Sequence, residues 1–227
     1  MYTNYAVREV KKVCKEVGPR ASGTENERKA QEHFKEEMKT CADDVQLEEF
    51  EMHKYAFMSW VVIDGVSLLL ALLFSFLKMP VVSLVLTVIA IVCMFAEFLM
   101  YWEFLDPLFP KAISTNVIGK RKPTGEVKRR IIFAGHVDSS YEWTYTHLGG
   151  KALLFTVGIY AVVGMFFVLV VSILSIVKGG AFHAELDGFV NVLKYVQLAF
   201  IPGFIAVIFF TNFKLPVDGA NDNLTGC

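Results

Sequence analysis

A histidine and an aspartate one residue apart carry the clearest metal-binding chemistry in the chain. His136 and Asp138 follow the apolar stretch 130–135 (R-I-I-F-A-G), which predicts a strand buried on both faces. In an extended chain, positions i and i+2 point to the same side. An imidazole binds a zinc-like ion well when a carboxylate accepts the proton of its other nitrogen. The pair therefore indicates a metal site at a strand end, with a solvated or purely structural pair as the alternative.

The segment 216–226 (P-V-D-G-A-N-D-N-L-T-G) adds a second candidate ligand, Asp222. Its glycine, asparagine and aspartate residues predict a tight turn that leads into a helix. One interpretation is a capped helix start, with Asp222 or Asn223 as the N-cap. The other is that the short carboxylate of Asp222, fixed on the turn, bridges two metal ions.

Four motifs in the same order resemble those of metallopeptidase family twenty-eight, the two-zinc aminopeptidases and carboxypeptidases. Residues 18–24 (G-P-R-A-S-G-T) resemble the N-terminal G-x-R-x-x-G-[ST] signature, and residues 116–119 (N-V-I-G) resemble the strand that precedes the metal site. A-G-H-V-D-S at 134–139 and G-A-N-D-N at 219–223 resemble two metal-binding segments of that family. The related family-twenty peptidases also use H-x-D, but G-A-N-D-N favours family twenty-eight.

The resemblance implies a role for each candidate residue. His136 would be a ligand of one zinc ion, Asp222 would bridge two zinc ions, and Asp138 would orient His136 for catalysis. The implied activity is that of an exopeptidase, in which zinc lowers the pKa of the water that attacks a terminal bond of a peptide substrate. The family's general-base glutamate and its later ligands have no counterpart before Cys227. We therefore expect this chain to be an incomplete part of such an enzyme, inactive by itself.

The polar parts of the chain predict the elements of an α/β fold, and the resemblance implies a partial zinc-exopeptidase-like sandwich. Apolar residues at three- and four-residue spacings predict a helix over 4–17, and the capping box Thr24-x-x-Glu27 predicts a second over 25–40. Alternating or continuous apolar residues predict three strands. These strands are 45–52, 115–119 and 130–135, with a turn at 120–128 between the last two.

Long apolar segments interrupt the polar parts. Four stretches of membrane length together hold only three charged residues, namely Asp64, Glu97 and Lys194. The stretches are 56–77, 80–102, 152–177 and 189–210. They predict two transmembrane helical hairpins in contact with a lipid bilayer; buried helices of a large soluble protein are the alternative. For the three charges we favour structural pairs or interfacial positions over a polar path through the membrane.

The hairpins divide the chain into five parts, and each hairpin returns the chain to the side from which it left. The parts are an N-terminal peptidase segment 1–55, hairpin 56–102, central strands 103–149, hairpin 150–210 and the metal-bridging segment 211–227. Lys and Arg number ten in 1–55 and seven in 103–149, whereas the two far loops offer only Lys78 and Lys178. The positive-inside rule therefore predicts that the peptidase domain faces the cytoplasm.

Composition excludes several other classes of protein. A net charge of −1 without a basic stripe argues against nucleic acid as a partner, and four scattered cysteines argue against a disulfide framework. A non-enzymatic membrane scaffold or chaperone on the same fold is the alternative function, and the retained His136, Asp138 and Asp222 argue against it. A four-helix transporter would show broken helices with inverted-repeat symmetry, and the scattered glycines and prolines show no such symmetry.

Overall fold

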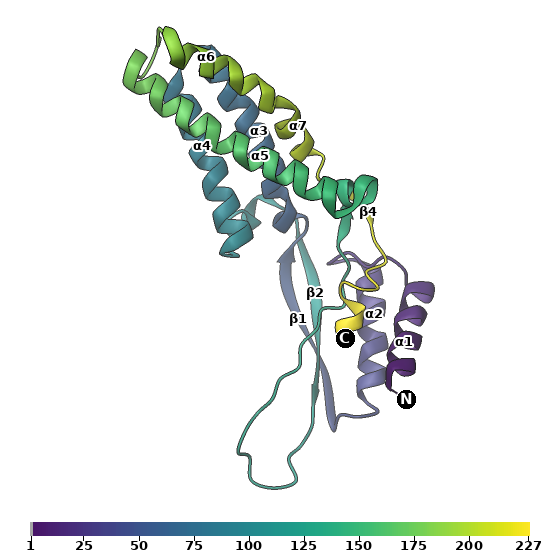
Figure 1. The fold of residues 1–227 in the computed structure, drawn as a ribbon. Helices are drawn as coiled ribbons and strands as arrows, with labels where there is room; N and C mark the ends of the chain where they lie inside the picture. The colour runs from purple at the N-terminus through teal and green to yellow at the C-terminus, as the bar shows by residue number, and fades with distance from the viewer. Residues whose placement is uncertain (1) are drawn as a thin grey trace. The chain divides into compact units, whose positions relative to one another are not determined.

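The computed structural model describes residues 2–227, which form two compact units of mixed helix and strand (Figure 1). Unit one contains the chain up to Lys54, Pro110–Glu142 and Phe213–Cys227. Unit two contains Tyr55–Phe109 and Trp143–Asn212, which are the two apolar excursions of the chain. The candidate site residues all belong to unit one.

Unit one begins with the two predicted helices, which the structure confirms. Helix α1 spans Tyr2–Glu16, and the chain turns at Gly18 and Pro19. Helix α2 spans Glu25–Met38, with Thr24 as its N-cap. The Thr24 side chain accepts a hydrogen bond from the Glu27 amide, and Glu27 Oε2 accepts one from the Gly23 amide at 2.6 Å. This reciprocal arrangement satisfies two backbone donors that the first helical turn leaves open.

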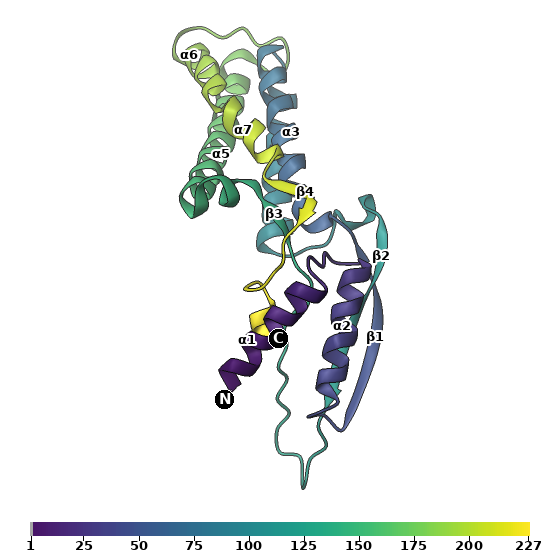
Figure 2. The same cartoon turned by 90° about the vertical axis from the view of Figure 1, so that its right-hand side faces the viewer.

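The two strands of the main sheet lie far apart in sequence and pair along their whole length. Strand β1 spans Asp44–His53 and strand β2 spans Lys111–Lys120, so both predicted strands are confirmed with longer bounds. They are antiparallel, from the pair Asp44 with Lys120 to the pair His53 with Lys111. Helix α2 packs against this ribbon (Figure 2). The sheet therefore joins the two sides of the first hairpin insertion.

The predicted central strand at 130–135 is wrong for this structure. Residues 121–140 form no helix or strand, and the Phe133 side chain is 93% exposed, beside exposed Ile131 and Ile132. A strand buried on both faces needs a hydrogen-bonded neighbour at each edge. Within residues 2–227, β1 and β2 pair only with each other, so this stretch has no neighbour. The described residues therefore show α2 packed on a two-stranded sheet and no larger layered sheet.

The C-terminal segment returns to unit one after the second excursion. Strand β3 (Tyr141–Trp143) pairs with strand β4 (Thr211–Pro216) in a second two-stranded sheet. The tail ends in a single 3-10 turn, η4 (Leu224–Gly226), at the position of the predicted helix start. Leu224 is buried with Val13 of α1 and Ala30 of α2. This small apolar core fixes the tail against both helices.

Unit two is a bundle of helices. Helix α3 (Ala56–Phe76) is followed by α4 (Pro80–Cys93), which continues as the π-helical turn η1 (Met94–Leu99) and is followed by the short η2 (Asp106–Leu108). Helix α5 (Thr144–Gly179) is followed by α6 (Gly188–Val196), the 3-10 turn η3 (Gln197–Phe200) and α7 (Ile201–Ile208). Within residues 2–227, four helical spans are thus long and apolar enough to cross a membrane.

Glycine and proline interrupt the regular helix in two of the spans, at Gly149–Gly150 and before Pro202. Gly149 and Gly150 have non-helical backbone angles, so the regular part of α5 begins after them, close to the predicted start at 152. The fourth span is interrupted by η3 before Pro202, whose missing amide hydrogen cannot continue the helical pattern. At most 44% of the most apolar part of any span is buried inside the structure. The exposed remainder is the surface that contact with lipid acyl chains would cover.

Candidate metal centre

Three predicted site residues lie together in unit one. His136 and Asp138 come from the irregular segment 121–140, and Asp222 comes from the tail. His136 Nδ1 lies 3.0 Å from Asp138 Oδ1, and His136 Nε2 lies 3.3 Å from Asp222 Oδ1. One imidazole therefore faces a carboxylate at each of its two nitrogens, although more than eighty residues separate Asp138 from Asp222.

The spacing of these atoms suits a shared metal ion. Two ligands of one tetrahedral zinc ion, each about 2.0–2.1 Å from the metal, stand about 3.4 Å apart. The 3.3 Å between His136 Nε2 and Asp222 Oδ1 is close to that value. A hydrogen bond donated by Nδ1 to Asp138 would select the tautomer whose Nε2 can bind an ion. The donor set thus fits zinc at two ligand positions.

A fully buried arginine holds the two ligand segments together. The Arg20 guanidinium donates to the Val137 carbonyl at 2.7 Å and to the Asp218 carbonyl at 2.6 Å. It also donates to the carbonyls of Gly18 and Gly219 at 3.1 and 3.2 Å. Val137 lies between His136 and Asp138, and Asp218 lies four residues before Asp222. Burial lowers the pKa of Arg20, and the negative charge of nearby acidic groups, Asp138 and Asp218 among them, opposes that change.

Backbone contacts in the same loop fix the positions further. The Arg20 amide donates to Ser139 Oγ at 2.9 Å, and the Ser139 amide donates to the Arg20 carbonyl at 3.0 Å. Gly219 has φ +55°, and a Cβ there would lie 2.6 Å from the Ser139 Cβ. A Cβ on Gly135 would lie 2.6 Å from the Gly226 carbonyl oxygen. Glycine is therefore required at both positions for the tail to approach the His136 segment.

Ser22, in the turn before α2, contacts Asp138, and Glu27, in the first turn of α2, supports the same region. Ser22 Oγ donates to Asp138 Oδ2 at 2.6 Å, so both carboxylate oxygens of Asp138 are engaged. Glu27 is buried, and its Oε1 accepts a hydrogen bond from Ser114 Oγ at 2.7 Å. Burial raises the pKa of Glu27, while the hydrogen bonds from Ser114 and Gly23 oppose the shift. Glu27 therefore supports the loop and β2 rather than the ligand set.

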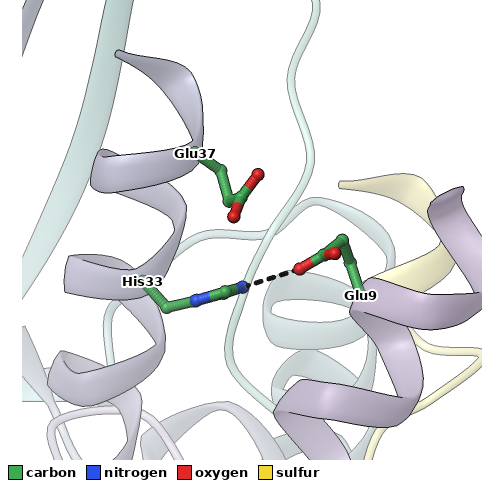
Figure 3. Close-up of side chains that lie close together, drawn as sticks. All are labelled: Glu9, His33 and Glu37. Atoms are coloured by element: carbon green, nitrogen blue, oxygen red, sulfur yellow. Dashed lines mark hydrogen bonds and ion pairs between the residues drawn. The ribbon is translucent and has the colours of Figure 1, made fainter. Parts of the chain in front are cut away.

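A second cluster with metal-ligand chemistry joins α1 to α2 (Figure 3). Glu9, His33 and Glu37 are the only described group of three such side chains whose ligand atoms all lie within 4.8 Å of one another. His33 Nε2 lies 3.2 Å from Glu9 Oε2. Arg8 donates to Glu9 at 2.9 Å and lowers the pKa of that carboxyl. The Tyr5 hydroxyl donates to Glu37 at 2.7 Å, which raises the pKa of Tyr5 to about 12.

Both carboxylates of this cluster thus already have a hydrogen-bond donor. We interpret it as an ion and hydrogen-bond network that links the two helices, and assign no metal to it. The spacing of His33 and Glu37, one turn apart on a helix, is the sequence signal that would have revealed it. No comparable local signal marks Arg20 or Ser22, whose partners come from distant segments.

Comparison with known proteins adds no assignment, since no model of a protein family, no curated protein and no solved structure matches this chain. The chemistry of the site therefore rests on its geometry and on the motifs described above.

Proposed function

We propose that this chain is the membrane-bound portion of a zinc-dependent exopeptidase, built on a zinc-exopeptidase-like sandwich. The observation that supports it best is the single imidazole of His136 placed between Asp138 and Asp222. A structural histidine in an irregular segment needs only one partner. His136 has a carboxylate at each nitrogen, and the two come from distant segments. A metal site requires this arrangement, because one carboxylate orients the imidazole and the other binds the ion beside it.

In this proposal each residue has a separate task. His136 Nε2 and the Asp222 carboxylate would hold zinc, with Asp222 also facing a second ion. Asp138 accepts the proton on Nδ1 and keeps the imidazole in its binding tautomer and orientation. When bound, zinc polarises a scissile carbonyl and lowers the pKa of water. Ser22 and Arg20 position the carboxylate and the loops; they do not touch the reacting atoms.

Two ligands do not complete a catalytic zinc site, which uses three protein ligands. That count favours a specific second candidate, a membrane scaffold that keeps the fold and has lost the metal. The two proposals differ in whether purified protein contains zinc. The peptidase proposal requires zinc in the purified protein, whereas the scaffold contains none.

Measurement of bound zinc tests the proposal. Purified protein in detergent is dialysed against metal-free buffer and its zinc content is measured by mass spectrometry of the element. We expect His136→Ala and Asp222→Ala to lose at least one equivalent of zinc. His183→Ala, the same change at an exposed histidine between α5 and α6, is the matched control and should keep the wild-type content. Zinc content equal to wild type in both site variants would overturn the proposal.

We further propose that the peptidase domain faces the cytoplasm and that the four spans lie in a lipid bilayer. Unit one assembles from three chain segments, each separated from the next by two spans. An even number of crossings brings all three to the same side. The excess of Lys and Arg in these segments over the two far loops supports the cytoplasmic side.

A further inference from the structure

The helices of unit two bury a row of polar side chains where a membrane bundle ordinarily buries apolar ones. The buried face of α4 and η1 carries Ser83, Thr87, Cys93 and Glu97. The facing elements add buried polar residues of their own, which are Asp64, Ser67 and Ser75 of α3, Ser172 and Ser175 of α5, and Gln197 of η3. Helices α3, α4 and α5 pack against one another along this row (Figure 1).

Most of these groups have a partner inside the bundle. Ser83 Oγ and Ser172 Oγ lie 2.9 Å apart, and Gln197 donates to Ser75 at 3.2 Å. Glu97 Oε1 accepts a hydrogen bond from the Leu105 amide at 3.0 Å. Such bonds hold membrane helices together, because lipid tails offer no competing partners. They do not account for the whole row, because Ser175 Oγ, Gln197 Oε1 and Asp64 Oδ1 are buried without a hydrogen-bond partner.

Within the described residues, Asp64 carries the only carboxylate among the buried side-chain atoms that lack a hydrogen-bond partner. Asp64 is only 6% exposed, and its Oδ1 atom is buried without a hydrogen-bond partner. It lies eight residues into α3, so about 12 Å along the helix from the end of the span. The nearest ionisable groups facing this region are Cys93 and Glu97 of the neighbouring span, whose thiol and carboxyl interact electrostatically. Neither carries a positive charge that could neutralise a carboxylate.

An ionised carboxylate at this depth, without a counter-charge, would cost several kcal/mol. The Asp64 carboxyl must therefore carry a bound cation for much of the time. A Cβ on the neighbouring Gly65 would lie 2.5 Å from Ile208 Cγ1 and 2.8 Å from the Phe204 carbonyl oxygen, so α3 and α7 pack closely next to Asp64.

We propose that Asp64 is an exchangeable binding site for a small monovalent cation, a proton or a sodium ion, inside the membrane bundle. The site is independent of the zinc centre and would give the membrane part a function of its own. The alternative is that Asp64 is a permanently protonated, structural residue. The experiment must distinguish this alternative from an exchangeable site.

Labelling with a hydrophobic carbodiimide tests the proposal on the full chain in detergent micelles. A protonated carboxyl adds across one C=N bond of the reagent, its proton passes to nitrogen, and the adduct rearranges to a stable N-acylurea with no atom lost. Peptide mass spectrometry locates the label. We expect labelling of Asp64 that falls about tenfold per pH unit once the pH exceeds the pKa of the group.

Sodium separates the two possible cations. A sodium site is identified if sodium chloride slows the labelling several-fold and potassium or choline chloride does not. A proton site is identified if none of the three salts changes the rate of labelling. Asp64→Asn should abolish the label, whereas Asp187→Asn, the same change at the exposed N-cap of α6, should not alter it. If Asp64→Asn fails to fold, the label found on the Asp64 peptide of the wild-type protein decides the result.

Two outcomes would overturn the proposal. Absence of label on Asp64 at every pH would show a carboxyl that never binds an accessible proton. Constant labelling from about pH 5 to about pH 10 would show a permanently neutral acid, which does not exchange its proton in that range. Both outcomes leave the zinc measurements unaffected, so failure of this proposal and failure of the peptidase proposal are distinguishable.

Discussion

At the scale of single residues, the candidate centre depends on a side chain that is not a ligand. Arg20 is fully buried, and its guanidinium donates hydrogen bonds to the carbonyls of Gly18, Val137 and Asp218. These three acceptors belong to separate segments of the chain. Its planar fork serves several acceptors at once, which an ammonium group or an apolar side chain cannot do. The distance between His136 and Asp222 is therefore set largely by a residue more than one hundred positions upstream.

Replacement of this arginine should loosen unit one. In Arg20→Met the carbonyls lose their donor inside the protein, and buried acceptors without partners cost roughly 1–3 kcal/mol each. We expect the opening free energy of α1 and α2 to fall by about 3 kcal/mol or more, measured by hydrogen exchange and mass spectrometry. Arg28→Met is the matched control, because Arg28 makes only an exposed 4.0 Å ion pair with Glu49 and should change that energy by less than about 1 kcal/mol. Equal losses in the two variants would refute the clamp.

The sequence predicted the three candidate residues that lie together, but not the contacts that support them. His136 and Asp138 follow from a spacing of two, and Asp222 follows from a motif, because both signals are local. The Arg20 clamp is not visible in sequence, since its acceptors are backbone carbonyls, which every residue possesses. The cluster of Glu9, His33 and Glu37 also joins two helices. Only the spacing of His33 and Glu37 is a local pattern, because Glu9 lies on the other helix.

At the scale of elements, local signals fixed the helices and failed for one strand. The capping residue Thr24 and the chain turn at Gly18 set the ends of α1 and α2, which depend on neighbours in sequence. The stretch 130–135 has strand-like residues, but a strand is formed by its pairing partners. Within residues 2–227 those partners are absent at its edges, so its apolar side chains are exposed.

A pair of matched substitutions distinguishes the buried tail from the exposed stretch. Leu224→Ala removes a side chain from the core formed with Val13 and Ala30, and should destabilise unit one by about 2–3 kcal/mol. Ile132→Ala removes an exposed side chain and should change the stability by less than about 0.5 kcal/mol. Hydrogen exchange of peptides from α1 and α2 measures both. A large loss in Ile132→Ala would show that 130–135 is paired in solution.

At the scale of the whole molecule, the two units differ in the solvent that each requires. Unit one has charged surfaces and a small core, whereas unit two exposes most of its apolar side chains. The four spans followed from hydropathy because the bilayer imposes a minimum length on every crossing. The breaks at Gly149–Gly150 and at η3 were not predicted, since glycine and proline also occur inside continuous membrane helices.

The orientation of the spans leads to a prediction that single-cysteine variants can check. Cys41 is exposed in unit one, and Phe182 is exposed in the loop between α5 and α6. With the other cysteines replaced, Cys41 should react with a membrane-impermeant maleimide only after cells are permeabilised. A Phe182→Cys variant that lacks Cys41 should react in intact cells. Reversed accessibility would contradict the cytoplasmic assignment, and labelling of both positions from one side would contradict the two spanning hairpins.

The division of unit one into three chain segments has a consequence for biogenesis. During synthesis the ribosome delivers α1, α2 and β1 first, yet β1 has no partner until a whole hairpin has entered the lipid and β2 has emerged. The segment with Asp222 follows only after a second hairpin. In the proposed membrane topology, nascent chains must therefore keep a half-formed domain soluble through two rounds of insertion, and a delay at either one would expose it to chaperones and proteases.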